Sequence, residues 1–228
     1  MAPGDWRNVG PMVLFGPNSK PLNVRCIGSF HVVGVGIRPS GWRALFNDTA
    51  DKYTDQMIAL GDVWSKRSDD LYRDVVGAAH DEQQIISVVE NHFREMSIKC
   101  GWPTADPQMQ EFERIARDDS TMTIADIADK IGLSSRQLER NCTAHFGMSP
   151  KRVLRRSRFL DMAAVMRGFS TVDEKELAAL RFTDQSHLNR EFKEFVGMTP
   201  GQFTNTPTPL LTAGLELRSK RKNNPELF

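Results

Sequence analysis

The stretches IADIADKIGLSSRQLERNCTAHFGMSP (residues 124–150) and FTDQSHLNREFKEFVGMTP (residues 182–200) decide the fold of this 228-residue chain. They resemble each other at an offset of 50 residues: Leu138 corresponds to Leu188 and Arg140 to Arg190, and both stretches end in G-M-[ST]-P. Self-similarity at a fixed spacing indicates related supersecondary units. We therefore expect two copies of one helical unit in this part of the chain.

The first copy has the signals of a helix-turn-helix. Thr123 is a suitable N-cap for a helix over 124–131, and Gly132 supplies the backbone freedom that a tight turn needs. A second helix is predicted to begin at Ser134 or Ser135 and to run to about His145. At helical spacing, its inner face consists of Leu138, Cys142 and Phe146.

The second copy repeats this arrangement. Asp173 or Glu174 opens a helix through Leu180, and Asp184 caps another helix that runs to about Phe195. The side chains that we expect inside are Leu188, Phe192 and Phe195. The glycine and proline that close each copy are typical of a helix end followed by a new helix.

The outer faces of the two second helices are rich in groups that can read base edges. Arg pairs with guanine, Asn and Gln pair with adenine, and Ser contacts either bases or phosphates. Any surface helix can show such residues, but two of them in a repeat favour DNA recognition. The candidate residues are Ser135, Arg136, Glu139 and Arg140 in the first helix and Gln185, Ser186, His187, Asn189, Arg190 and Lys193 in the second.

Residues 150–167 are predicted to form one helix between the two copies. At 1.5 Å per residue it would span roughly 27 Å, a little less than one turn of DNA. Between Glu139 and Asp161 the chain has no acidic residue, and this stretch contains several arginines. The basic block is either a solvated helix face or a phosphate-binding surface, and we include Arg155 as a candidate phosphate contact.

These residues resemble the AraC/XylS family of bacterial regulators, above all in IADIADKIGLSSRQLERNCTAHFGMSPKRVLRRSRF and FTDQSHLNREFKEFVGMTPGQF. The resemblance implies an all-helical domain over 108–203 whose two helix-turn-helix units enter adjacent major-groove segments. It also implies double-stranded DNA and RNA polymerase as partners, a small-molecule effector and a homodimer. The three scattered cysteines, with no C-x-x-C pair, favour a reducing cytoplasm. This chain departs from the family pattern at Arg181, where glycine is usual, and at Asn141 and Cys142, where a basic residue and Phe are usual.

Residues 1–100 are expected to form a small α+β regulatory domain, so that the whole chain is mainly α. Residues 22–27 and 30–37 favour a β-hairpin, with a short strand near 12–15. Helices are predicted over 68–76 and 81–96, a linker over 101–107 and a flexible basic tail over 204–228. Residues 9–98 more weakly resemble the regulatory domain of a subset of these regulators, in which earlier strands are expected, so a trimmed domain or a misplaced start stays open.

Other classes of function find less support. The N-terminus lacks the pattern of a signal peptide, and the glycines near Gly34 miss the dinucleotide-binding spacing because Pro39 stands where the third glycine should be. We find no metal-binding spacing, expect no cofactor, and expect Cys26 and Cys100 to pack as small hydrophobic residues. A hydrolase would need catalytic residues that we do not find. The alternative is a ligand-sensing or protein-interaction module with a degenerate DNA-binding domain.

Overall fold

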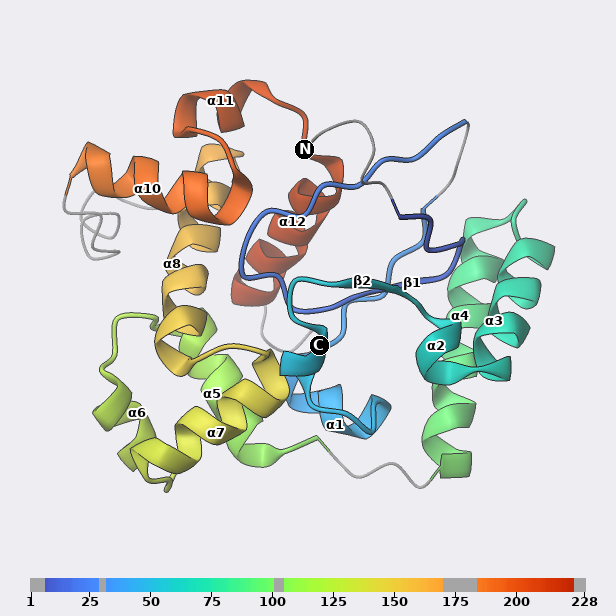
Figure 1. The fold of residues 1–228 in the computed structure, drawn as a ribbon, viewed down its shortest axis with the longest axis horizontal. Coiled ribbons are helices and arrows are strands. Elements are labelled where there is room, and N and C mark those ends of the chain that lie inside the picture. Colours follow the sequence, from blue (N-terminus) through green and yellow to red (C-terminus); the bar gives the residue numbers. More distant parts are fainter. Residues whose placement is uncertain (1–6, 29–31, 101–104, 170–183, 224–228) are drawn as a thin grey trace.

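The structure, a computed structural model, describes residues 7–28, 32–100, 105–169 and 184–223. It is mainly helical, as predicted (Figure 1). The longer helices are α3 (Lys66–Gly77), α4 (Glu82–Cys100), α5 (Pro107–Asp118), α6 (Ile124–Lys130), α7 (Ser135–Phe146), α8 (Pro150–Met166), α10 (Gln185–Val196), α11 (Pro200–Asn205) and α12 (Pro209–Asn223). The short elements are β1 (Val13–Phe15), η1 (Pro39–Gly41), α1 (Trp42–Leu45), η2 (Ala50–Tyr53), β2 (Met57–Ala59) and α2 (Gly61–Trp64).

The N-terminal region is built on a small antiparallel sheet. β1 pairs with β2, with Val13 opposite Ala59 and Phe15 opposite Met57. The aromatic rings of Trp42, Phe46 and Trp64 form the centre of its core, with Phe46 stacked on Trp64 at 5.8 Å between ring centroids. Helices α3 and α4 confirm the predictions over 68–76 and 81–96.

The predicted hairpin over 22–27 and 30–37 is wrong. Among the described residues of this stretch, 22–28 and 32–37, none lies in a strand. Ile27 is 87% exposed, and Val32, Val33 and Val35 are also exposed. β propensity reflects packing against a neighbouring strand, and the strand that does pair is the one predicted near 12–15, whose partner is β2.

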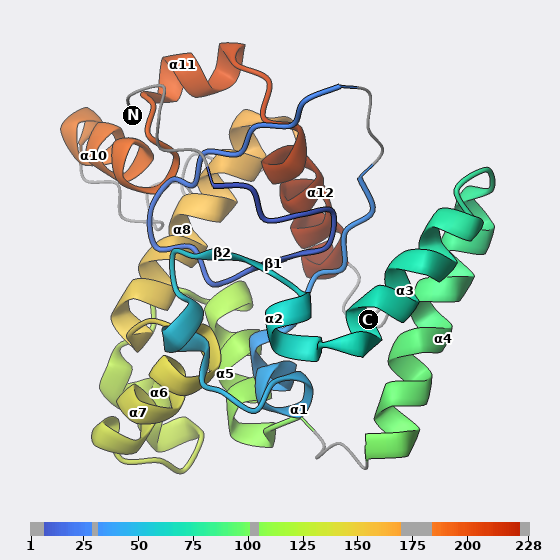
Figure 2. The same cartoon turned by 45° about the vertical axis from the view of Figure 1, so that its right-hand side comes forward.

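The C-terminal helices have two separate hydrophobic cores, and α8 contributes to both. Val153 and Leu154, near its start, pack with α5, α6 and α7 around Phe112 and Leu138. Further along α8, Phe159 and its neighbours pack against the inner face of α10. The predicted connecting helix is thus confirmed, and α7 lies near one end of it and α10 near the other (Figures 1 and 2).

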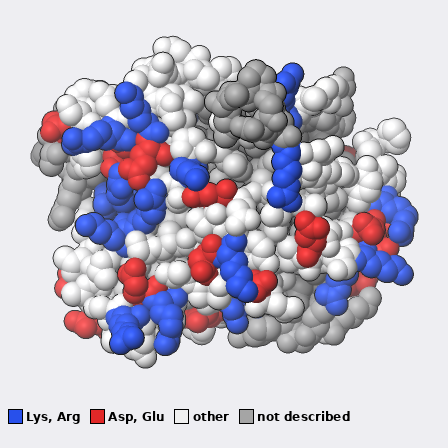
Figure 3. All heavy atoms as spheres, in the orientation of Figure 1, with Lys and Arg blue, Asp and Glu red and all other residues white. Residues whose placement is uncertain are grey.

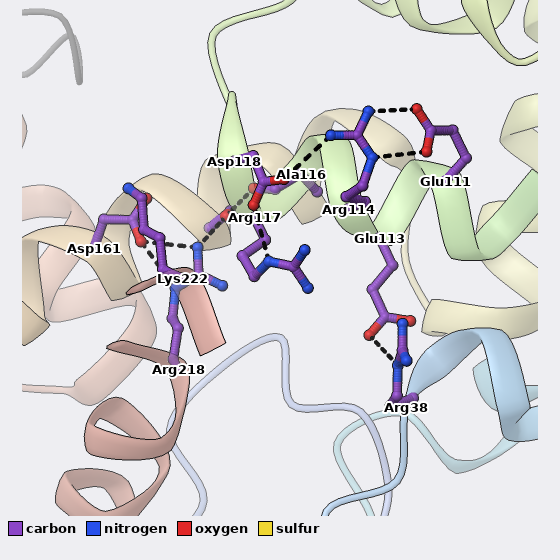
Figure 4. Close-up of polar contacts among 11 residues, drawn as sticks. Arg38, Glu111, Glu113, Arg114, Ala116, Arg117, Asp118, Asp161, Arg218 and Lys222 are labelled. Carbon is purple, nitrogen blue, oxygen red and sulfur yellow. Dashed lines mark hydrogen bonds and ion pairs between the residues drawn. The ribbon is translucent and has the colours of Figure 1, made fainter. Parts of the chain in front are cut away.

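A helix replaces the expected flexible tail. α12 lies along α8, and its Leu215 is fully buried in the core that contains Phe159 and Phe203. Arg218 of α12 donates to Asp161 of α8 at 2.9 Å (Figure 4). The apolar side chains of Leu211 and Leu215 lie one helical turn apart and face this core, which explains why the segment is ordered.

The N-terminal region packs directly on the first helix-turn-helix unit. Glu113 of α5 accepts hydrogen bonds from Arg38 Nε at 3.1 Å and from Ser40 Oγ at 2.9 Å, and Figure 4 shows the Arg38 contact. His145, near the end of α7, lies with its Nδ1 3.2 Å from the carbonyl oxygen of Pro39. The predicted linker is described only from residue 105 onward, where Asp106 caps α5.

Candidate nucleic-acid interface

The first helix-turn-helix unit has the predicted local geometry. Thr123 caps α6, and Gly132 takes a positive φ of 70° at the turn. A hydrogen bond of 2.9 Å from Leu133 N to the carbonyl oxygen of Ala128 closes the turn. Of the two N-cap candidates for α7, Ser134 holds the position, in a capping box with Gln137. The turn therefore fixes the direction in which α7 starts.

The outer face of α7 is open to solvent. Ser135, Arg136, Glu139 and Arg140 are all exposed, and four of the residues that line a shallow hollow here are Ser134, Arg136, Glu139 and Arg140. Within the described part of the chain, no ion pair joins Glu139 to either arginine. The charged groups of α7 are thus not held by one another, and they are available to a ligand.

The inner face of α7 explains how this helix is held. Leu138 and Cys142 are fully buried, and Phe146 packs edge-on against Phe112 with ring centroids 5.2 Å apart. Burial raises the pKa of the Cys142 thiol well above its ordinary value, so this cysteine packs as a small apolar residue. Cys26, which we expected to pack, is exposed instead, and the side chain of Cys100 lies outside the described residues.

The second candidate recognition helix, α10, begins in a similar way. Asp184 caps it by accepting from His187 N at 2.7 Å, and Gly197 ends it with a φ of 74°. Gln185, Ser186, Arg190 and Lys193 are exposed, whereas His187 and Asn189 are partly buried. The helix predicted before it, over about 174–180, falls outside the described residues, as does Arg181.

Arg155 has a different surrounding from the one we expected. Its Nε donates to Glu191 at 2.7 Å, its Nη atoms contact Glu194, and its guanidinium lies 5.5 Å from the centre of the Phe195 ring. Burial opposes its charge, but the hydrogen bonds to Glu194 and Glu191 raise its pKa above the ordinary value. Its charge is neutralised by α10, so we leave it out of the proposed phosphate contacts.

Three residues important for the arrangement were missed from the sequence. Arg152 pairs with Glu194 at 2.9 Å, and Glu191 and Glu194 together hold Arg155. The lack of acidic residues between Glu139 and Asp161 was a signal that the arginines of α8 need partners from another element. In Figure 3, red atoms indeed lie among the blue ones on the side where α8 and α10 meet, and further blue atoms gather over α7.

The comparisons with known proteins agree with this geometry. Residues 127–206 match the family model described as a helix-turn-helix domain, a span that includes both α7 and α10. No curated protein and no solved structure matches the chain. None of the described helices is both long enough and apolar enough to span a membrane. Over this matched span, the chain carries an AraC-type helix-turn-helix domain.

Proposed function

We propose that the chain is a sequence-specific transcription regulator that reads two adjacent major-groove segments of DNA, one with α7 and one with α10. The observation that carries this proposal is the matching exposure of the two helices. In each, the residues at the N-terminal end, Ser135 and Arg136 or Gln185 and Ser186, are exposed, while the C-terminal end is held by the rest of the protein. In helix-turn-helix proteins the N-terminal residues of the recognition helix contact the bases.

The span of α8 supports the same proposal. Its 17 residues extend about 25 Å at 1.5 Å per residue, and the two units pack on its two ends. Successive visits to the major groove on one face of a duplex are about 34 Å apart. Since α7 packs near the start of α8 and α10 packs further along it, we expect the two helices to reach neighbouring groove segments.

Further partners come from the family resemblance. It supports a small-molecule effector bound by the N-terminal region, a homodimer and contact with RNA polymerase. Because the DNA of a bacterium lies in its cytoplasm, we propose that the protein works there.

The proposal is tested by selecting bound duplexes from a random-sequence library and measuring the affinity of variants for the selected sequence. We expect Arg136→Ala and Arg190→Ala each to lose about 1–3 kcal/mol on the selected duplex and much less on random DNA. Arg73→Ala is the matched control, because it removes an exposed arginine from α3, outside the two candidate recognition helices.

Two results would contradict the proposal. Equal losses on selected and random DNA would show that neither arginine reads bases. Failure to retain any duplex at low salt would favour the ligand-sensing module with a degenerate DNA-binding domain.

A further inference from the structure

We call the loop that follows β1 the clasp loop. It consists of residues 16–21, with the sequence GPNSKP. Asp55 fixes its shape. The Asp55 carboxylate accepts from Ser19 N at 2.7 Å, from Ser19 Oγ at 2.6 Å and from Lys20 N at 3.2 Å, and Asp55 N donates to the carbonyl oxygen of Pro17 at 2.8 Å. Asp55 itself has a φ of 59°, a conformation uncommon for a non-glycine residue. The clasp loop is therefore a fixed structure.

The two prolines of the clasp loop contact the two copies of the repeat at equivalent positions. Gly147 ends α7 and Gly197 ends α10, and both have positive φ. A Cβ at Gly147 would lie 2.8 Å from Pro17 Cγ, and a Cβ at Gly197 would lie 3.3 Å from Pro21 Cγ. Thr54, next to Asp55, adds a 2.9 Å hydrogen bond from its Oγ1 to the carbonyl oxygen of Gly147.

Arg152 joins the same loop to the second unit. Its Nη2 donates to the carbonyl oxygen of Ser19 at 2.5 Å and also pairs with Glu194 of α10 at 2.9 Å. A chain of polar contacts therefore runs from the clasp loop through α8 to α10. Figures 1 and 2 both show the dark-blue N-terminal segment passing beside α8 and the end of α10.

We propose that the clasp loop, held by Asp55, sets the separation and orientation of α7 and α10, and so fixes the spacing between the two DNA segments that the protein accepts. The inference rests on the proposed function. The clasp loop contacts each reading helix at its C-terminal end, so it constrains both helices without covering the residues that face DNA. Pro17, Pro21, Asp55 and Arg152 are positioning residues in this scheme.

The physical effect is that of joining two binding modules rigidly. Two modules on a stiff connector bind two correctly spaced sites far more tightly than one site, and this advantage disappears when the geometry does not fit. A looser connector loses part of the advantage at the best spacing but tolerates other spacings. The dependence of affinity on spacing therefore reports directly on the clasp loop.

The first experiment uses a duplex selected by the wild-type protein and copies with one to five base pairs inserted between its two half-sites. We expect the wild-type protein to lose at least about tenfold in affinity after a short insertion. Asp55→Gly removes the carboxylate yet suits the positive φ, and we expect it to bind the original duplex more weakly and to lose less than about threefold on insertion. Asp51→Gly is the matched control, since Asp51 is exposed in the neighbouring η2.

A second pair of variants tests the contact itself. Gly147→Ala would push Pro17 and Thr54 away, whereas Gly168→Ala meets the same backbone strain, at a φ of 74°, with nothing within 4 Å of the new Cβ. Only Gly147→Ala should weaken the dependence of DNA affinity on the spacing between the two half-sites. A wild-type spacing profile in both Asp55→Gly and Gly147→Ala would overturn the proposal.

A measurement without DNA separates this inference from the proposed function. Spin labels at Arg140→Cys and Lys193→Cys, with the native cysteines replaced, report the distance between α7 and α10. We expect one narrow distance distribution in the otherwise wild-type protein and a broader one after Asp55→Gly. An unchanged distribution would refute the clasp even if DNA binds, and a broadened one would support it even if no duplex is selected.

Discussion

At the scale of single residues, Arg155 is held between Glu191 and Glu194 on the side of α8 that faces α10. The Glu191 side chain is only 4% exposed, so removal of the guanidinium leaves a buried carboxylate with the ring of His187, 3.3 Å away, as its remaining partner among the described residues. We expect Arg155→Ala to lower the free energy of unfolding by about 2 kcal/mol. This is less than the cost of breaking a fully buried ion pair, because solvent screens a pair that is partly exposed. Urea denaturation measures this, and Arg155→Ala combined with Glu191→Gln should recover part of the loss. Full stability in the single variant would show that the pair contributes nothing.

Arg156, the next residue, has the opposite surrounding. It is partly buried, no carboxylate of the described residues pairs with it, and burial together with Arg218 lowers its pKa to about 10. At neutral pH the side chain is charged in both the folded and the unfolded protein, and burying the charge destabilises the folded state. This cost begins to be relieved only as the pH rises above 10, and it is gone only when the pH reaches the higher pKa of arginine in the unfolded chain. Arg156→Met keeps the aliphatic stem, and we expect it to raise the free energy of unfolding at pH 7 by about 1 kcal/mol. A lower stability would mean that the charge has a favourable partner.

At the scale of elements, α12 offers a test of whether the C-terminal segment is part of the fold. Leu215 is fully buried beside Phe159 and Phe203, while Leu217 on the same helix is 37% exposed. We expect Leu215→Ala to cost about 3 kcal/mol of stability, because it leaves a cavity in a packed core, and Leu217→Ala to cost less than about 1 kcal/mol. If both substitutions have equally small effects on stability in thermal denaturation, the result would favour the flexible tail that we expected from the sequence.

The contrast between the elements predicted well and those predicted badly follows from where their determinants lie. The boundaries of α6, α7, α8 and α10 depend on neighbouring residues, namely N-caps, glycines with positive φ and apolar residues at helical spacing. The partner of β1 depends on a segment more than 40 residues away, which no local pattern indicates. The same limit applies to α12, whose apolar residues are few and gain their stability from α8.

The residues of the candidate interface also fall into those that the sequence predicts and those that it does not. Exposure of Arg136, Arg140 and Arg190 could be predicted, because helical periodicity separates inner from outer positions. The role of Arg155 could not, since its partners belong to another helix that meets α8 only in the folded protein. The contacts of the clasp loop could not be predicted from the sequence either, because they join residues near position 20 to turns near 147 and 197.

At the scale of the whole molecule, the N-terminal region and the helix-turn-helix domain share an extensive contact, and we expect them to unfold together. All four tryptophans lie within the first 102 residues, so tryptophan fluorescence follows the N-terminal region, where Trp42 and Trp64 are buried. Far-UV circular dichroism follows the helices of the whole chain. Coincident transitions by the two probes are the mark of a cooperative unit.

Glu113 is the residue whose loss should uncouple the two parts. It lies on α5 and accepts hydrogen bonds from Arg38 and Ser40, and the Ser40 carbonyl oxygen in turn accepts from Asp106 N at 3.2 Å. In Glu113→Ala, Ser40 Oγ keeps no partner at a buried position, so the fluorescence transition should move to lower urea than the circular dichroism transition. Glu111→Ala is the control, because the ion pair that Glu111 makes among the described residues is with Arg114 of its own helix. If the two transitions of Glu113→Ala still coincide, the contact through η1 does not couple the regions, and the clasp loop and α7 must carry that coupling instead.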